Sequence, residues 1–370
     1  MKYKIDSEKA VANAGNWYRL KELMKRAEKG ENLTIGFLGG SITMGSVSST
    51  PETCYAYLVF DWWQKTFPNA RFTYINAGIG GTTSQFGAAR VHADLLQYNP
   101  DFAITEFSVN DDDTEHFLET YEGTIRNIYN YKTKPAILIV NSVYYNDGRN
   151  AQAQHNKIGK AYQIPCVSMQ SSIYPQVEAG VISNREITPD DLHPNDAGHE
   201  LVAGIITHFL EKVYAAINIE ETAVPMIAPV SKNEYEHSVR YQNGSSTFTS
   251  NGFVSDLTKQ ETITQFFRNG WTANNLGDSI CFQIEGTGTA VQFRKSIHKP
   301  TPVAVAIVDG DEEHAVILDG NFEEDWGDCL YLQTLTKHTE KKIHKVEIRI
   351  TETHDDDVVP FYLVSVIGSY

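Results

Sequence analysis

The alternation of apolar strands with helices over residues 30–218 constrains the fold of this chain most. Short runs rich in strand-forming residues lie at residues 33–38, 72–75, 102–109, 136–143 and 165–169, and segments with helical periodicity separate them. Strands that alternate with helices at this spacing require a parallel sheet covered by helices on both faces. We therefore expect an α/β domain with a five-stranded parallel sheet.

The character of the sequence changes after residue 219. Residues 220–232 contain Pro225 and Pro229 without any periodicity, which is typical of a linker. Beyond it, short alternating runs, one of them at residues 262–267, are separated by turn residues. We expect a first domain at residues 1–219, a linker at 220–232 and an antiparallel β-sandwich at 233–370.

Composition and charge limit the classes of partner. The 370 residues include 47 acidic and 31 basic ones, and the formal net charge of -16 disfavours nucleic acid and anionic membrane surfaces. We expect a neutral partner. The N-terminal residues lack the apolar core of a secretory signal, and no segment approaches the length of a membrane span, so we expect a cytoplasmic protein. The sequence does not indicate an oligomeric state.

Cysteine usage agrees with a reducing compartment. The four cysteines are far apart in the chain and mostly lie in apolar runs, namely Cys54, Cys166, Cys281 and Cys329. This pattern indicates reduced, buried thiols rather than disulfides or a zinc site.

Residues 33–43 suggest a reactive serine. An apolar run ends in Gly39 and Gly40, which are followed by Ser41. Glycine permits a sharp turn, so the hydroxyl can project from the carboxyl end of the strand, where ligands bind in open α/β sheets. The alternative is that Ser41 merely caps the next helix.

A serine hydroxyl becomes a nucleophile when a base takes its proton and a third group orients that base. Asp190 lies three residues before His193, a spacing that also occurs at residues 113–116 and 311–314. Only the pair at 190 and 193 lies between the last strand and the last helix of the α/β domain. We predict His193 as the base and Asp190 as its orienting group, with Asp191 as the alternative.

Acyl transfer also needs donors for the oxyanion, and two candidates follow the second and third strands. A glycine-rich turn exposes the backbone N–H of Gly81, and Asn110 supplies a side-chain amide. Turn chemistry or helix capping would explain either feature alone. Together with Ser41 and the Asp190–His193 pair, in this order along the chain, they favour catalysis.

These four blocks, over about residues 30–218, resemble the SGNH hydrolases, the GDSL-type esterases. Gly40 stands where the usual Gly-Asp-Ser motif has aspartate, which is similar to carbohydrate-acting branches of the family. The resemblance implies a flavodoxin-like three-layer fold with Ser41 as nucleophile, His193 as base and Asp190 as its partner. It also implies an oxyanion hole made by the N–H groups of Ser41 and Gly81 and the amide of Asn110.

A catalytic domain of this kind followed by a β-sandwich is similar to the family-17 carbohydrate esterases. These are acetyl mannan esterases with a jelly-roll module that resembles family-35 carbohydrate-binding modules. The resemblance implies removal of 2-O-acetyl groups from the mannose of mannooligosaccharides inside the cell. The alternatives are a lysophospholipase or thioesterase on the same fold, or a carbohydrate-binding protein without catalysis.

Substrate contacts are expected in two places. Trp326 and Asp328 lie in a polar, glycine-containing loop, and an indole offers a sugar ring a flat apolar face. Asp111, next to Asn110, is the third candidate. Trp271 is expected in the core of the sandwich.

We expect neither a metal nor a cofactor. The acidic runs at residues 111–113 and 355–357 lack a calcium-loop pattern, and no histidine pair has zinc spacing. His155, His199 and His208 are expected to be surface or structural residues.

Overall fold

The computed structural model describes residues 3 and 5–370, which divide into two compact units. The first unit is Met1–Asn233 and the second is Glu234–Tyr370. Residues 220–232, which we expected to link two domains, are therefore part of the first unit.

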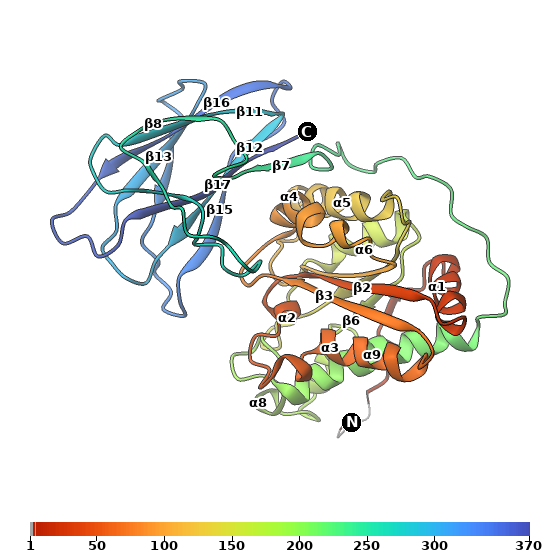
Figure 1. Ribbon diagram of the computed structural model, residues 1–370. Coiled ribbons are helices and arrows are strands. Elements are labelled where there is room, and N and C mark those ends of the chain that lie inside the picture. Colours follow the sequence, from red (N-terminus) through yellow and green to blue (C-terminus); the bar gives the residue numbers. More distant parts are fainter. Residues whose placement is uncertain (1–2, 4) are drawn as a thin grey trace. The chain divides into compact units, whose positions relative to one another are not determined.

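The first unit is a three-layer α/β domain built around one sheet (Figure 1). The strand order is β1-β6-β5-β4-β2-β3, in which five strands are parallel and β1 pairs antiparallel with β6. Helices α1, α3 and α9 lie on one side of the sheet and α4, α5 and α6 on the other (Figure 1). The elements are β1 (Val11–Asn13), α1 (Tyr18–Glu28), β2 (Asn32–Gly39), α2 (Ser41–Met44), η1 (Pro51–Thr53), α3 (Tyr55–Thr66), β3 (Arg71–Gly78), α4 (Ser84–Asp94), η2 (Leu96–Tyr98), β4 (Phe102–Glu106), α5 (Glu115–Tyr129), β5 (Ala136–Asn141), α6 (Gln152–Ala161), β6 (Cys166–Ser168), α7 (Tyr174–Glu178), α8 (Asn184–Ile187) and α9 (Asp196–Ala215).

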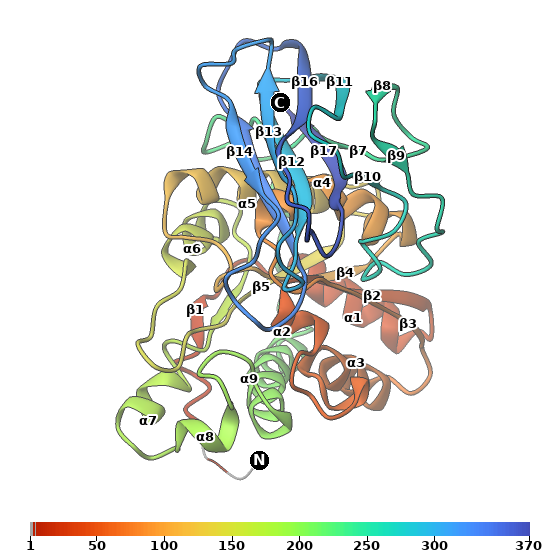
Figure 2. The ribbon, with the colours of Figure 1, turned by 90° about the vertical axis from the view of Figure 1, so that its left-hand side faces the viewer.

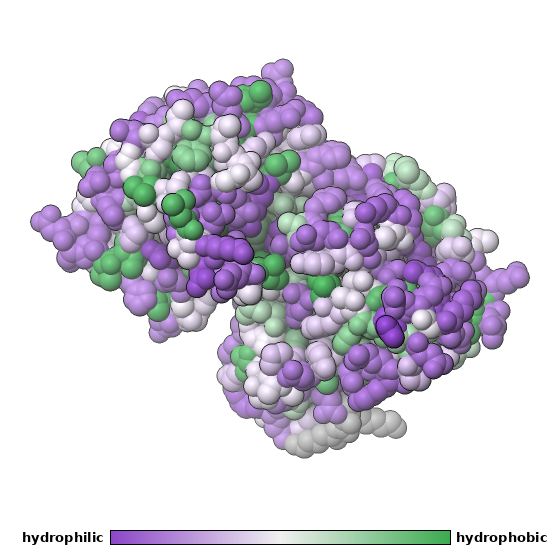
Figure 3. Space-filling model, in the orientation of Figure 1, coloured by the Kyte–Doolittle hydropathy of each residue, from purple (hydrophilic) through white to green (hydrophobic). Residues whose placement is uncertain are grey.

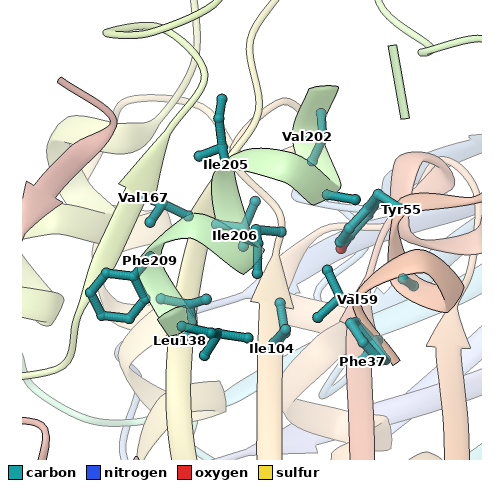
Figure 4. Close-up of a cluster of buried hydrophobic side chains, with 14 of the residues drawn as sticks. Phe37, Tyr55, Val59, Ile104, Leu138, Val167, Val202, Ile205, Ile206 and Phe209 are labelled. Atoms are coloured by element: carbon teal, nitrogen blue, oxygen red, sulfur yellow. The ribbon is translucent and has the colours of Figure 1, made fainter. Parts of the chain in front are cut away.

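The predicted five parallel strands are confirmed, and β1 is the strand that the sequence analysis missed. The core on the α3 and α9 side accounts for the apolar residues that face this side of the sheet. Phe37, Ile104 and Leu138 project from neighbouring strands against Ile206 and Phe209 of α9 (Figure 4). All five side chains are buried, and burial of each such side chain contributes about 1.5–3 kcal/mol relative to exposure.

Parallel pairing brings the carboxyl ends of β2, β3 and β4 to one edge of the sheet. Gly39 at the end of β2 pairs with Gly78 of β3 on one side and with Glu106 of β4 on the other. The segments that follow these three strands therefore begin side by side, although they are far apart in the sequence.

Residues 219–231, here called the strap, are fixed to the first unit by polar contacts. Lys21 of α1 and Arg126 of α5 donate to strap carbonyls, each at 3.0 Å. Glu122 of α5 is buried and accepts from two strap N–H groups at 2.7 and 2.8 Å. The strap thus lacks the free backbone of a flexible linker.

The second unit is an antiparallel β-sandwich (Figure 2). One sheet has the order β15-β12-β17-β10-β9 with β7 also paired to β17, and the other has the order β14-β13-β16-β11-β8. Its strands are β7 (Ser238–Tyr241), β8 (Phe248–Asn251), β9 (Val254–Ser255), β10 (Trp271–Ala273), β11 (Ser279–Gly286), β12 (Gly288–Lys295), β13 (Val303–Val308), β14 (Val316–Asp319), β15 (Cys329–Thr336), β16 (Lys342–Glu352) and β17 (Phe361–Ser369).

The prediction of a strand at residues 262–267 is wrong. This segment bonds to itself, since Gln265 N–H donates to Thr262 O and the Gln265 side chain accepts from Glu261 N–H. Trp271 is fully buried between the sheets, as expected.

Hydrophilic residues cover most of the face shown in Figure 3. Among the residues that the structure describes, no helix combines the length and the apolar character needed to cross a membrane. The four cysteines are free, and three of them are buried.

Candidate active site

Ser41 lies at the junction between β2 and the short helix α2. The side chain is largely buried, with 7% of the residue exposed. The turn closes behind it, because the N–H groups of Gly45 and Ser46 both donate to the carbonyl of Ser41 at 3.0 Å. The Ser41 hydroxyl is therefore held on a short, rigid turn at the carboxyl edge of the sheet.

His193 reaches this hydroxyl from the loop before α9. His193 Nε2 lies 2.8 Å from Ser41 Oγ, and His193 Nδ1 lies 2.6 Å from Asp190 Oδ2. When Asp190 accepts the Nδ1 proton, Nε2 is left with a lone pair that faces the hydroxyl. The structure thus brings together the three residues that the sequence predicts as nucleophile, base and orienting group.

The Asp190 carboxylate is held by its own loop. Its Oδ1 accepts from the N–H groups of His193 and Leu192 at 2.7 and 3.0 Å, and from the Thr188 hydroxyl at 3.1 Å. Partial burial alone would raise the pKa of Asp190, but the hydrogen bonds from the His193 ring and these N–H groups outweigh it and lower the pKa. The carboxylate consequently stays charged beside the base.

Asp191, the alternative partner of His193, contacts other residues instead. Its side chain accepts from Asn184 and forms an ion pair of 2.9 Å with Arg185. Its backbone has a positive φ of 69°, and its carbonyl accepts from Tyr145 N–H at 2.7 Å. Of the two aspartates, Asp190 is therefore the one whose carboxylate contacts the His193 ring in this structure.

The predicted oxyanion donors lie around Ser41. A Cβ atom built on Gly80 would lie 3.7 Å from Ser41 Cβ, which places the glycine turn directly beside the nucleophile. Gly81, the next residue, has a φ of 68°, which favours glycine, and no described residue accepts from its N–H group. This N–H group is available to a ligand.

Asn110 approaches from the other side. A Cβ atom on Gly40 would lie only 2.2 Å from Asn110 Oδ1, so the amide occupies the space that any larger residue would need. Asn110 Oδ1 is buried and makes no hydrogen bond to the described residues, and this orientation turns the amide NH₂ away from Gly40. A residue with a Cβ atom at position 40 would require the Asn110 side chain to shift.

The prediction that Asp111 contacts the substrate is wrong in this structure. Its side chain is fully buried, its Oδ1 accepts from Ser84 N–H at 2.8 Å, and its Oδ2 lies 3.0 Å from His155 Nε2. Both carboxylate oxygens are occupied inside the domain, so no face of Asp111 is left for a sugar.

The other two predicted contacts lie in the second unit. Trp326 is 58% exposed, packs edge-on against Phe322 at 5.1 Å and donates to Glu324. Asp328 accepts from the Ser296 hydroxyl at 2.7 Å and from Ile297 N–H at 3.1 Å. Asp328 thus fastens the loop that presents the indole.

Glu106 is a notable residue that the sequence analysis did not single out. It is fully buried at the end of β4, and its carbonyl accepts from Gly40 N–H at 3.2 Å. Burial raises the pKa of its side chain to about 7, although the hydroxyls of Ser108 and Ser142 oppose the shift. The sequence does not reveal the burial and the raised pKa of Glu106, because a glutamate at the end of an apolar strand is usually exposed.

Comparison with known proteins identifies the family of the chain. The GDSL-like Lipase/Acylhydrolase family profile matches residues 37–201, a span that contains Ser41, Asn110, Asp190 and His193. Two crystal structures of a two-domain esterase (CEX) active on acetylated mannans, one of them co-crystallized with mannopentaose, are each 61% identical to this chain. They cover 99% of this chain and 98% and 99% of their own, each with a TM-score of 0.96. The chain belongs to the GDSL-type, or SGNH, hydrolases. A search of curated proteins found no match.

In this GDSL-type hydrolase, replacing each of the neighbouring residues Asp190 and Asp191 by asparagine, one at a time, tests which of them belongs to the triad. We expect Asp190→Asn to lower kcat for 4-nitrophenyl acetate by about 10³- to 10⁴-fold, because the amide favours the wrong imidazole tautomer. Asp191→Asn is the matched control and should retain most of the activity. The reverse ranking in steady-state kinetics would transfer the role to Asp191.

The buried Glu106 gives this hydrolase a pH-dependent stability. Between its usual pKa of 4.5 and the folded value of about 7, the folded state keeps a proton that the unfolded chain has released. Stability attributable to Glu106 therefore falls as the pH rises through this window, by about 1.4 kcal/mol per pH unit at most. Glu106→Gln removes the ionisation.

We compare the unfolding free energy of Glu106→Gln with that of the native chain at pH 5 and at pH 8. We expect the difference to favour the variant more at pH 8 than at pH 5. Urea unfolding of both proteins at the two pH values measures this difference. A difference in unfolding free energy that is the same at both pH values would contradict the raised pKa.

Proposed function

We propose that this chain is an esterase that removes O-acetyl groups from mannooligosaccharides, with the 2-O-acetyl group of mannose as its target. The observation that carries the proposal is the continuous hydrogen-bonded chain from Ser41 Oγ through His193 to Asp190. The substrate class is supported by the likeness, at 61% identity over both units, to an esterase active on acetylated mannans.

The chemistry follows from the geometry. His193 Nε2 takes the proton of Ser41 Oγ, which attacks the acetyl carbonyl and forms a tetrahedral intermediate. The N–H groups of Ser41 and Gly81 and the amide of Asn110 stabilise its oxyanion. His193 then gives the proton to the departing sugar oxygen, and water, activated by the same base, hydrolyses the acetyl-enzyme.

Two other functions fit less of the structure. A carbohydrate-binding protein without catalysis would have no use for a base held 2.8 Å from a largely buried serine hydroxyl. A lysophospholipase or thioesterase would use the same triad but would leave the sandwich with its exposed Trp326 unexplained.

The deciding experiment measures acetate release from acetylated mannooligosaccharides and acetylated xylooligosaccharides, with the residual acetyl groups mapped by NMR. We expect loss of 2-O-acetyl from mannose, and at least a 10³-fold lower rate for Ser41→Ala because the nucleophile is absent. Equal action on both sugars would keep the esterase and reject the mannan preference. Release of long acyl chains alone would favour the lipid esterase.

We also propose that Trp326 binds sugar. An exposed indole held edge-on by Phe322 presents its apolar face to a pyranose at little conformational cost. In the Ser41→Ala background, which cannot turn over substrate, Trp326→Ala should weaken mannopentaose binding about 10-fold by calorimetry. Hydrolysis of 4-nitrophenyl acetate by the single variant Trp326→Ala should stay unchanged. Unaltered mannopentaose affinity would remove Trp326 from the sugar site.

A further inference from the structure

We infer that Asp111 and His155 are positioning residues that set the spacing between the oxyanion-hole donors. This inference rests on the proposed acyl transfer at Ser41. Neither residue touches the nucleophile or its base, and both side chains are fully buried beneath the site.

Asp111 connects the two chain segments that supply the donors. It directly follows Asn110, and its own N–H donates to the carbonyl of Phe107 at 2.9 Å, which closes the turn after β4. Its Oδ1 accepts from the N–H of Ser84, three residues after Gly81, at 2.8 Å. One carboxylate therefore holds the turn that carries the Asn110 amide against the turn that carries the Gly81 N–H group.

His155 of α6 fixes this carboxylate from behind. Its Nε2 lies 3.0 Å from Asp111 Oδ2, while its Nδ1 is buried and has no hydrogen-bond partner in the described part of the chain. Nε2 is therefore the nitrogen that donates to Asp111, because a proton on Nδ1 would leave a buried N–H group without an acceptor.

The ring of His155 is also fixed in orientation. It stacks on Tyr121 of α5 with the ring centroids 3.7 Å apart and the planes inclined by 11°. The start of α6 is tied to the same turn as Asn110, because Ala151 N–H donates to the carbonyl of Ser108 at 2.7 Å. Helices α5 and α6 thus brace the turn after β4.

A buried carboxylate is tolerated only when its oxygens are hydrogen-bonded. Without the His155 donor, Asp111 would lose one of its two partners and move toward water, and the turns would shift with it. Misplacement of a catalytic group by about 1 Å costs up to about 10²-fold in rate. The expected defect is therefore in transition-state stabilisation.

The test uses three variants of the full-length chain with 4-nitrophenyl acetate, so that it does not depend on the sugar. His155→Phe keeps an aromatic ring on Tyr121 but removes the donor, and we expect kcat/KM to fall about 10- to 100-fold. His155→Gln restores an N–H donor near the position of Nε2 and should recover part of the activity. His208→Gln, which changes a surface histidine of α9 that contacts Glu8 at 3.2 Å, is the control and should keep its activity.

A double-mutant cycle distinguishes positioning from general destabilisation. Asn110→Ala removes the donor itself and should cost about 10²-fold or more. Once Asn110 is gone, His155→Phe should cost much less than it does alone, because the donor that it positioned is absent. Asp111→Asn, which keeps the shape of the side chain, repeats the cycle if His155→Phe does not fold.

Equal costs with and without Asn110, or full activity of folded His155→Phe, would overturn the inference. Failure of the native chain to hydrolyse the ester would instead refute the proposed function, so the two failures are distinguishable.

Discussion

The contact between Gly40 and the Asn110 amide is the constraint on which the rest of the site depends. Strands β2 and β4 are neighbours, so the residues that follow them lie close together, and a Cβ atom on Gly40 would lie only 2.2 Å from Asn110 Oδ1. With no side chain on Gly40, Asn110 can occupy the space beside the turn that carries Ser41. The size of residue 40 thus limits where the Asn110 amide can lie, and glycine leaves the space that the amide occupies in this chain.

Three carboxylates near the sheet edge have different environments and therefore different roles. Asp190 is half exposed and receives hydrogen bonds that keep it ionised next to His193. Asp111 is buried but has two partners, whereas Glu106 is buried with one oxygen left unpartnered among the described residues. The same chemical group thus orients a base, braces a turn or takes up a proton, depending on what surrounds it.

The predicted site residues that the structure brings together rest on local signals. Ser41 and the Asp190–His193 pair could be found because glycine before serine, and aspartate three residues before histidine, reflect contacts within one turn. Asp111 was misjudged because burial depends on α4 and α6, which lie far away in the sequence. β1 was missed because three residues carry too little periodicity, and residues 262–267 were misjudged because strand-forming residues do not show whether a partner strand exists.

The strap has a consequence for how the first unit could be isolated. Glu122 and Lys21 are both buried, and strap groups supply part of their hydrogen bonds. A fragment that ended with α9 would remove the strap partners of both side chains and leave Glu122 with the hydrogen bond from the Tyr162 hydroxyl. The smallest autonomous catalytic piece therefore extends beyond its last helix, to about residue 233, and its boundary is defined by polar contacts and not by secondary structure.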